Sequence, residues 1–367
     1  MAHQPFECLW PNHQPDFNRL DAVFHRQGTP DRVPFIELFA DPEIIADILE
    51  EAYVPYSWQN RAQSEAGHLQ RIRFCYKTGW DSVWMPIQLK FKRHDLLADD
   101  TANLSLAQRN WVNESEGIIQ TWEDFERYDW PSWGAVNEAD FEFMAANLPE
   151  GMKMIASTGG MLEWVMWLMG FVPFSLALYE QPDLVEAMFQ RVGDIHAEAV
   201  AKAMQMPGVG AFFLGDDMGY KTGTFIKHEH MRQHVFPQQK RLAEIVHKQG
   251  LPFLLHACGN LEGVMEDLIE DVGIDAKHSF EDVIMPVGDA KGRYGERIAI
   301  LGGVDVDMLC TASEEEVRAY TRKVLEACMP GGGYALGTGN SVVNYMPVGN
   351  YIAMLDEGMQ VGWYTQR

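Results

Sequence analysis

His256 and Cys258 stand two residues apart at the end of an apolar run, in the segment LLHACGN of residues 254–260. In an extended strand, residues two apart face the same side, so these two side chains would point in one direction. A thiolate and a neutral imidazole are both standard zinc ligands, and two of them on one strand would supply half of a tetrahedral site. The structural alternative stays open, because a lone buried cysteine usually behaves as an inert apolar side chain and a lone histidine usually forms a core hydrogen bond.

Asp216 and Asp217 form a second candidate, because they are adjacent carboxylates at the end of another apolar run. Such a pair could bind a metal, orient a substrate or act as acid and base, since neighbouring carboxylates in a cleft push their pKa values apart. One of them could instead cap the helix that follows. Neighbouring strand residues face opposite ways, so we expect only one of the two to reach a site, and Asp217 is preferred.

The segment GTGNSVVNYMP of residues 337–347 is a third candidate. Its glycines would let a ligand approach the backbone closely, beside Thr338 and Asn340. The alternative is a tight loop that leads into a helix near Pro347.

Eight apolar runs rich in β-branched or aromatic residues recur along the chain, and each is followed by an amphipathic segment or a helix-start signal. We expect strands over residues 32–38, 81–87, 152–158, 209–217, 252–258, 274–280, 297–305 and 332–340. Helices are expected between them, for example over residues 42–53, 184–206 and 313–328, the last with a Ser-x-x-Glu capping box. This alternation predicts an α/β fold, a (β/α)8 TIM barrel.

The carboxyl ends of the strands in such a barrel converge on one open mouth, where the chemistry takes place. Polar side chains buried there need a partner, which can be a metal, a substrate, water or one another. We expect catalytic roles for Asp216, Asp217 and Glu281, and a metal site made by His256, Cys258 and Asp217. Substrate contacts are expected from Ser157, His278, Asp305, Thr338 and Asn340.

Residues 88–151 are too long for one strand crossover, and they contain an alternating segment, LKFKRHDL, followed by EGIIQTW. We expect an inserted hairpin and helix here, between the second and third strands. Because no short internal repeat or low-complexity linker interrupts the sequence, we treat residues 1–367 as a single domain.

The chain has 367 residues and a formal net charge of -24, which argues against binding nucleic acid, since the phosphates would be repelled. No run approaches the roughly 18 apolar residues that a membrane helix requires, and the amino terminus lacks the pattern of a signal peptide. The five cysteines are odd in number and scattered, so we expect reduced thiols and a cytoplasmic location. Small molecules or protein partners are the expected ligands.

Several of these segments together resemble the superfamily that joins uroporphyrinogen decarboxylase to the zinc-dependent, cobalamin-linked methyltransferases. The resemblance is carried, in chain order, by DRVPFIELF, LGDDMGYKTGTFIKHEHMRQHVFP, LLHACGN, DVGIDAKHSFE, RIAILGGVDVDML and GGGYALGTGNSVVNYMPVGNYIAML. It covers most of the chain, is more specific in the second half, and implies the same barrel that the strand pattern predicts.

The methyltransferase branch of this superfamily implies His256 and Cys258 as zinc ligands, together with a cysteine after the last strand. This chain has Thr338 at that last position, and a neutral hydroxyl is a poor zinc ligand. Either a carboxylate, Asp217 or Glu281, replaces the cysteine, or the metal is bound weakly or not at all. The resemblance implies a zinc-dependent methyltransferase that acts on a small substrate and exchanges the methyl group with methylcobalamin on a corrinoid partner protein.

The decarboxylase branch implies a different chemistry, in which no cofactor is needed and arginines near the amino terminus bind the carboxylates of the substrate. The corresponding segment here, FIELFADPEII of residues 35–45, contains no arginine, and the acidic chain would repel uroporphyrinogen. We therefore expect a methyltransferase. The alternatives are a cofactor-free decarboxylase of a porphyrinogen-like substrate, in which Asp216 or Asp217 stabilises a cationic intermediate, and a ligand-binding member without turnover.

Overall fold

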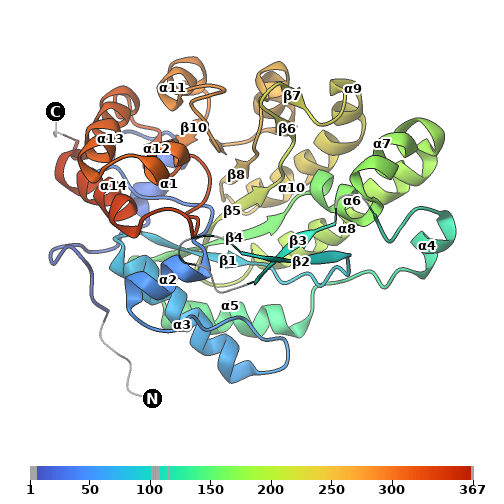
Figure 1. Ribbon diagram of the computed structural model, residues 1–367, viewed down its shortest axis with the longest axis horizontal. Helices are drawn as coiled ribbons and strands as arrows, with labels where there is room; N and C mark the ends of the chain where they lie inside the picture. The colour runs from blue at the N-terminus through green and yellow to red at the C-terminus, as the bar shows by residue number, and fades with distance from the viewer. Residues whose placement is uncertain (1–5, 101, 103, 105–107, 114–115, 365–367) are drawn as a thin grey trace.

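A computed structural model describes residues 6–100, 102, 104, 108–113 and 116–364 of the chain. At its centre is a sheet of seven parallel strands, surrounded by helices (Figure 1). The strand order is β1 (Ser82–Pro86), β4 (Lys153–Gly159), β5 (Val209–Gly215), β8 (Phe253–His256), β9 (Ala276–His278), β10 (Ala299–Leu301) and β11 (Tyr334–Ala335). Chain order and spatial order agree, as expected for consecutive βα units around a barrel.

The first predicted strand, residues 32–38, is the exception, because it forms no regular ladder. It lies beside β11 as an extended segment that makes single parallel bridges, such as Phe35 with Leu336. The Pro34 carbonyl accepts from the Leu336 N–H at 2.9 Å, and the Ile36 N–H donates to the Leu336 carbonyl at 2.9 Å. Proline has no N–H with which to extend the ladder, so the prediction of a full strand here is wrong, although the segment lies next to the last strand.

Most helices cover the outside of the sheet, whereas α1 packs against its inner layer (Figure 1). The helices are α1 (Asn18–Phe24), α2 (Pro42–Leu49), α3 (Arg61–Lys77), α4 (Trp122–Arg127), α5 (Ala135–Asn147), α6 (Met161–Met169), α7 (Phe171–Glu180), α8 (Pro182–Ala203), α9 (His228–His230), α10 (Phe236–His247), α11 (Val287–Tyr294), α12 (Val306–Thr311), α13 (Glu314–Cys328) and α14 (Val348–Val361). Short π or 3-10 segments lie at Met231–Val235, Glu262–Val264 and Asp267–Val272. The predicted capping box is confirmed at α13, where Ser313 Oγ accepts from the Glu316 N–H and the Glu316 carboxylate accepts from the Ser313 N–H. Among the described helices none is by itself long and apolar enough to span a membrane, although α6 and α7 pass that test as a bent pair.

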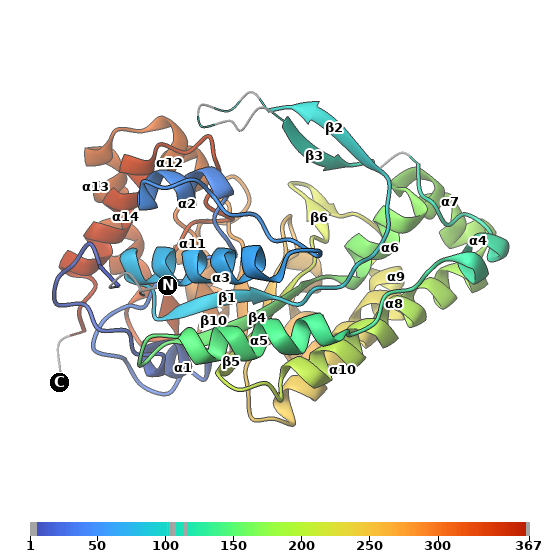
Figure 2. The ribbon, with the colours of Figure 1, turned by 90° about the horizontal axis from the view of Figure 1, so that it is seen from below.

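The chain between β1 and β4 contains an antiparallel hairpin of β2 (Asp95–Asp99) and β3 (Gln108–Val112), followed by α4 and α5. This is the region in which the sequence predicts a hairpin and a helix. Figure 2 shows the hairpin standing away from the central sheet. Phe91 stacks on Trp164 of α6 with ring centroids 4.4 Å apart, so the segment that leads into the hairpin packs on α6. A second short hairpin, β6 (Gly219–Tyr220) with β7 (Gly223–Thr224), follows β5.

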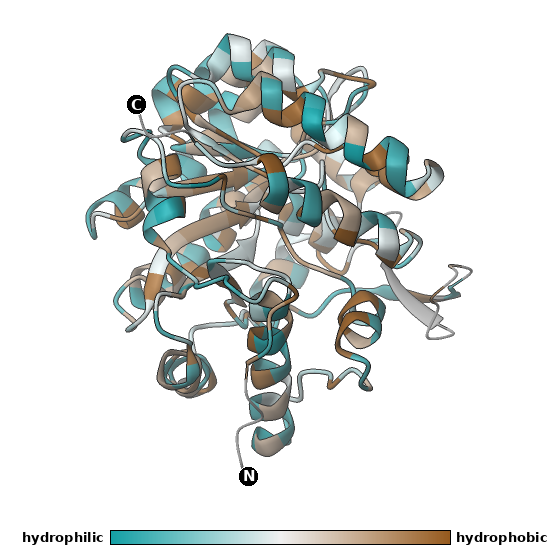
Figure 3. Cartoon of the chain, turned by 90° about the vertical axis from the view of Figure 1, so that its left-hand side faces the viewer, coloured by the Kyte–Doolittle hydropathy of each residue, from teal (hydrophilic) through white to brown (hydrophobic). Residues whose placement is uncertain are grey.

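The core has two layers, because successive side chains on each strand face opposite sides of the sheet. The inner layer contains Phe213 and Leu254 together with small residues such as Ala276, and α1 packs against it. The larger outer layer lies between the sheet and the helices. Figure 3 shows these apolar segments in the interior and hydrophilic residues on the outer helix surfaces. His256 and His278 follow Leu254 and Ala276 by two residues, so strand alternation turns both histidines toward the barrel interior.

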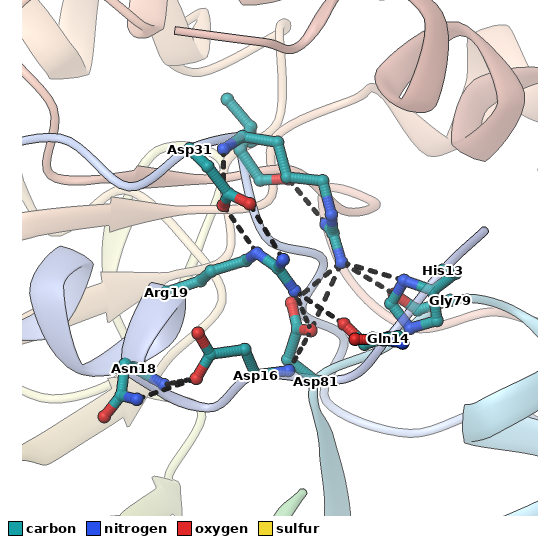
Figure 4. Close-up of polar contacts among 10 residues, drawn as sticks. His13, Gln14, Asp16, Asn18, Arg19, Asp31, Gly79 and Asp81 are labelled. Carbon is teal, nitrogen blue, oxygen red and sulfur yellow. Dashed lines mark hydrogen bonds and ion pairs between the residues drawn. The ribbon is translucent and has the colours of Figure 1, made fainter. Parts of the chain in front are cut away.

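The amino-terminal end of the sheet carries a buried polar network (Figure 4). Asp81, just before β1, accepts from Arg19 Nη1 at 2.9 Å and from Arg32 Nη2 at 3.0 Å. Arg19 also donates to both carboxylate oxygens of Asp31, at 2.6 and 2.9 Å. Arg32 is 2% exposed and Asp81 is 0% exposed. These two buried charges are of opposite sign and pair with each other, as buried charges need to do.

Candidate metal centre

Asp217, His256 and Cys258 come together where β5 and β8 end. Their candidate ligand atoms all lie within 4.8 Å of one another. His256 Nε2 is 3.4 Å from Asp217 Oδ1 and 3.5 Å from Cys258 Sγ. A carboxylate, an imidazole and a thiolate are the ligand types that zinc accepts, so the donor set fits a zinc ion with three protein ligands.

Strand register and loop packing bring these residues together, because the last residue of β5 lies opposite His256 of β8. Asp217 stands two residues beyond β5, and its carboxylate accepts from the Cys258 N–H at 2.8 Å. Gly259 has a φ of +97°, and a Cβ there would lie 2.2 Å from the carbonyl carbon of Gly219. Only glycine therefore lets the loops after β5 and β8 pack this closely.

The carboxylate of Asp217 is the anionic member of this cluster. Burial alone would raise the pKa of Asp217, but the neighbouring His256 ring and the hydrogen bond from the Cys258 N–H outweigh burial and lower that pKa to about 2. The side chain of Asp217 is 36% exposed, whereas that of His256 is almost fully buried. Asp217 is thus ionised at neutral pH, and the cluster is reachable from the side of this residue.

The sulfur of Cys258 is held by two neighbouring side chains. Asn340 Nδ2 donates to Sγ at 3.1 Å, and the Ser279 hydroxyl lies 3.5 Å from it. Burial and the Asp217 carboxylate raise the pKa of the Cys258 thiol to about 12. The thiol therefore keeps its proton at neutral pH unless a bound cation lowers that pKa, as zinc does.

His278 stands behind His256, because the register of β8 and β9 pairs these two residues. Its Nδ1 lies 2.8 Å from His256 Nδ1, and its Nε2 lies 3.1 Å from the Thr338 carbonyl oxygen. Burial and the neighbouring His256 lower the pKa of His278 well below its usual value. Both ring nitrogens have protein partners, so His278, which the sequence assigned to substrate binding, contacts His256 instead.

Thr338 turns its hydroxyl toward Glu37 and is itself fully buried. Its Oγ1 donates to Glu37 Oε2 at 2.6 Å, and its N–H donates to Glu37 Oε1 at 2.9 Å. Burial raises the pKa of Glu37 to about 8, against the effect of these two hydrogen bonds. Thr338, also assigned to substrate binding from the sequence, thus anchors the loop after β11 to the segment of residues 32–38.

Asp216 points away from the cluster and caps α6. Its carboxylate accepts from the N–H groups of Leu162 and Glu163, at 3.1 and 3.2 Å, and from Gln239 Nε2 at 2.8 Å. Burial raises the pKa of Asp216 to about 7, although the Gln239 hydrogen bond opposes this shift. As predicted from strand alternation, the two adjacent carboxylates have different surroundings: Asp216 caps α6, and Asp217 belongs to the cluster. We therefore give Asp216 no catalytic role.

A cavity of about 780 Å³ adjoins the cluster through Asn340, which lines the cavity and also contacts Cys258. The charged residues of its lining are four carboxylates and one lysine, namely Glu281, Asp282, Asp305, Asp307 and Lys221.

Three residues from the predicted site, Glu281, Asp305 and Asn340, share this cavity. Asp305 also caps α12, because its carboxylate accepts from the Asp307 N–H at 2.9 Å. Ser157, by contrast, lies in β4 opposite Pro86 and does not line the cavity.

Lys277 is a residue that sequence reasoning missed, and it is buried behind the strand ends. Its Nζ donates to the carbonyls of Ala257, His278 and Ser279, at 3.2, 3.1 and 2.9 Å. Burial lowers the pKa of Lys277 to about 8, against the opposing effect of nearby carboxylates, Asp217 and Glu281. The signal in the sequence is a lysine inside an otherwise apolar predicted strand.

Glu163, in the first turn of α6, was also missed. Burial and the charges of Asp217 and Asp216 raise the pKa of Glu163 well above its usual value, so a neutral carboxylic acid lies near the cluster. Glutamate is common in the first turn of a helix, so nothing in the sequence distinguishes this residue.

The sequence model of the uroporphyrinogen decarboxylase (URO-D) family matches residues 119–360, which is more than half of the chain. The uroporphyrinogen decarboxylase of Anaeromyxobacter dehalogenans is 25% identical over 201 residues, which cover 53% of each protein. The methylcobamide:CoM methyltransferase MtbA of Methanosarcina mazei is 26% identical over 196 residues, which cover 50% of this chain and 55% of that protein. The chain thus spans about half the length of these curated relatives.

A solved structure of a methyltransferase from Methanosarcina mazei matches this fold with a TM-score of 0.67, over 95% of this chain and 99% of that one. Its sequence identity is 16%, so this likeness concerns the fold, and it confirms the predicted barrel-type α/β architecture. The quoted motifs and the matched residues 119–360 overlap through the second half of the chain. The chain belongs to the uroporphyrinogen decarboxylase (URO-D) family.

Proposed function

We propose that this chain is a zinc-dependent methyltransferase that acts on a small substrate together with a corrinoid partner protein. The observation that carries the proposal is the convergence of Asp217, His256 and Cys258 at the strand ends, with candidate ligand atoms within 4.8 Å. The match to a methylcobamide:CoM methyltransferase supports the same chemistry. Zinc bound here would hold a thiol substrate as its thiolate, which is a good nucleophile for a methyl group at neutral pH.

The side chains of the chain have separate tasks in this proposal. His256 supplies an imidazole ligand, Cys258 supplies a thiolate, and Asp217 takes the place of the family's second cysteine. Asn340 donates to Cys258 Sγ and so stabilises negative charge on that sulfur. The ammonium group of Lys277, held by three carbonyls behind the strand ends, offsets the charge of the two anionic ligands.

The cavity beside Asn340 is the proposed substrate space. Four carboxylates and one lysine line it, so its potential favours a neutral or cationic small molecule over an anion that carries several charges. Glu281 and Lys221 are the lining residues from which we expect contacts with polar groups of the substrate.

Decarboxylation of a porphyrinogen-like substrate is the second candidate, because the matched family and the relative from Anaeromyxobacter dehalogenans carry that name. The charges near the cluster weigh against it. Residues 35–45 contain no arginine, and the charged lining of the cavity is mainly acidic. Asp216, a candidate for stabilising a cationic intermediate, is already held by the first turn of α6 and by Gln239.

Elemental analysis of the purified protein tests the proposal. We expect about one zinc per chain, and its loss in a His256→Ala, Cys258→Ser double variant. Cys310→Ser is the control, because Cys310 is a half-buried cysteine of α12 outside the cluster, and this variant should keep its zinc. Incubation with free methylcobalamin and a panel of small thiols should show methyl transfer in the unchanged chain but not in the double variant.

Two other outcomes would replace this function. A chain without zinc that converts uroporphyrinogen to a decarboxylated product would establish the second candidate. A chain without zinc that catalyses neither reaction, yet is stabilised by a small ligand, would be a binding protein without turnover.

A further inference from the structure

Hydrogen bonds lead from Thr338 through His278 to His256, and we call these three residues the histidine relay. A carbonyl oxygen only accepts, so His278 Nε2, which lies 3.1 Å from the Thr338 carbonyl, must carry a proton. The Nδ1 atoms of His278 and His256 are 2.8 Å apart, which is a hydrogen-bond distance. Such a bond needs one proton between the two nitrogens.

That proton belongs to His256 Nδ1. If it belonged to His278, that ring would carry two N–H groups and a positive charge while being 0% exposed. The hydrogen-bond partners of His278 are a histidine and a carbonyl, and neither supplies a negative charge, so this state is strongly unfavourable. His256 therefore donates from Nδ1, and its Nε2 faces Asp217 and Cys258.

The surrounding structure leaves little freedom to the relay. Glu37 accepts hydrogen bonds from both the N–H and the hydroxyl of Thr338. These two bonds fix the backbone of Thr338, whose carbonyl accepts the hydrogen bond from His278. Gly302 has a φ of +70°, and a Cβ there would lie 2.7 Å from His278 Nε2 and 2.3 Å from the Thr338 carbonyl oxygen. Gly302 is thus a position at which a larger residue would displace the relay.

We propose that His278 is a positioning residue of the metal centre, which keeps His256 protonated on Nδ1 and turned so that Nε2 is the ligand atom. The proposal rests on the proposed function. A ligating histidine usually donates its other N–H to a carboxylate, a backbone carbonyl or a water. In this chain the N–H of His256 is donated to a second histidine, His278, which in turn donates to the backbone carbonyl of Thr338. His278 is itself fully buried.

The test compares His278→Phe with His278→Gln, because phenylalanine removes both hydrogen bonds while glutamine keeps one acceptor and one donor. Zinc affinity should fall about 10- to 100-fold in the phenylalanine variant and be largely restored by glutamine. Nitrogen NMR with ¹⁵N-labelled histidine rings supplies a second readout. In the zinc-loaded unchanged chain, His256 should be protonated on Nδ1 and bound through Nε2, and this pattern should weaken in His278→Phe.

His196→Phe is the matched control, because His196 is another fully buried histidine with a backbone carbonyl as partner, Val192 O at 2.8 Å from Nδ1. It should lower stability without changing zinc affinity or the NMR pattern of His256. If His278→Phe binds zinc as tightly as the unchanged chain and leaves the NMR pattern of His256 unchanged, the positioning role of His278 is overturned, while the proposed function stands. An unchanged chain that binds no zinc would overturn the proposed function, and the protonation of His256 in that metal-free chain would still decide the relay.

Discussion

Buried polar groups have different kinds of partner at the two ends of the barrel. At the amino-terminal end, Asp81 pairs with Arg19 and Arg32, so negative and positive charges meet. At the carboxyl end, Asp217, His256 and Cys258 bring together three groups that all offer lone pairs. The first arrangement is complete by itself, whereas the second needs a proton or a cation to separate its lone pairs. Pairing, more than burial, distinguishes the stabilising network from the candidate binding site.

Asp81→Ala should break the amino-terminal network and have the largest effect on stability. It leaves Arg32, which is 2% exposed, without its carboxylate, and an unpaired buried charge costs about 3–5 kcal/mol. Asp31→Ala is the control, because Asp31 is the 47% exposed partner of Arg19, and its loss should cost less than about 1 kcal/mol. Urea unfolding measures both variants, and equal costs would contradict the central place of Asp81.

Glu37→Gln should reveal a buried carboxyl of a different kind, because Glu37 accepts hydrogen bonds from Thr338 whereas Asp81 pairs with arginines. Burial raises the pKa of Glu37 to about 8, so the folded chain keeps a proton that the unfolded chain releases near pH 4.5. Stability of the unchanged chain should therefore fall between these values as pH rises, by at most about 1.4 kcal/mol per pH unit. Glutamine stays neutral and should remove this part of the pH dependence.

Urea unfolding of both chains at several pH values within that window measures the difference. The gap in unfolding free energy should move in favour of Glu37→Gln as pH rises. A gap that does not change with pH would mean that Glu37 is ionised in the folded chain.

Asp217→Asn and Asp216→Asn should separate the two roles of adjacent carboxylates. Loss of the charge on Asp217 should weaken zinc binding by about 100-fold, which is about 2.7 kcal/mol, without unfolding the protein. Asp216→Asn should instead lower the melting temperature, because Asp216 accepts from the first turn of α6, and leave zinc affinity unchanged. The reverse result would move the metal ligand from Asp217 to Asp216.

Asn340→Ala should give the smallest effect. It removes the donor that lies 3.1 Å from Cys258 Sγ, and one hydrogen bond contributes about 1 kcal/mol, or roughly fivefold in zinc affinity. Ser279→Ala should cost less, since its hydroxyl lies farther away, at 3.5 Å. Zinc titration against a competing chelator measures both, and no change in Asn340→Ala would remove it from the site.

Much of the central sheet could be predicted from the sequence, because short apolar runs decide strand conformation locally. The run predicted over residues 209–217, for example, contains β5, Val209–Gly215. The common direction of His256 and Cys258 and the separation of Asp217 from Asp216 were likewise predictable, since both follow from the alternation of an extended chain. The segment of residues 32–38 was overpredicted, because β propensity does not reveal whether a neighbouring strand can complete a ladder.

The sequence by itself determined that ligand-type side chains stand where apolar strands end. Only the tertiary structure decided which of them meet. Thr338 contacts Glu37 across 301 sequence positions, and His278 reaches His256 through the register of β8 and β9. Register and loop packing depend on contacts between segments far apart in the chain, and spacing within one segment does not encode them. The fold therefore placed His278 and Thr338 behind His256, and left Asp217, His256 and Cys258 facing one another.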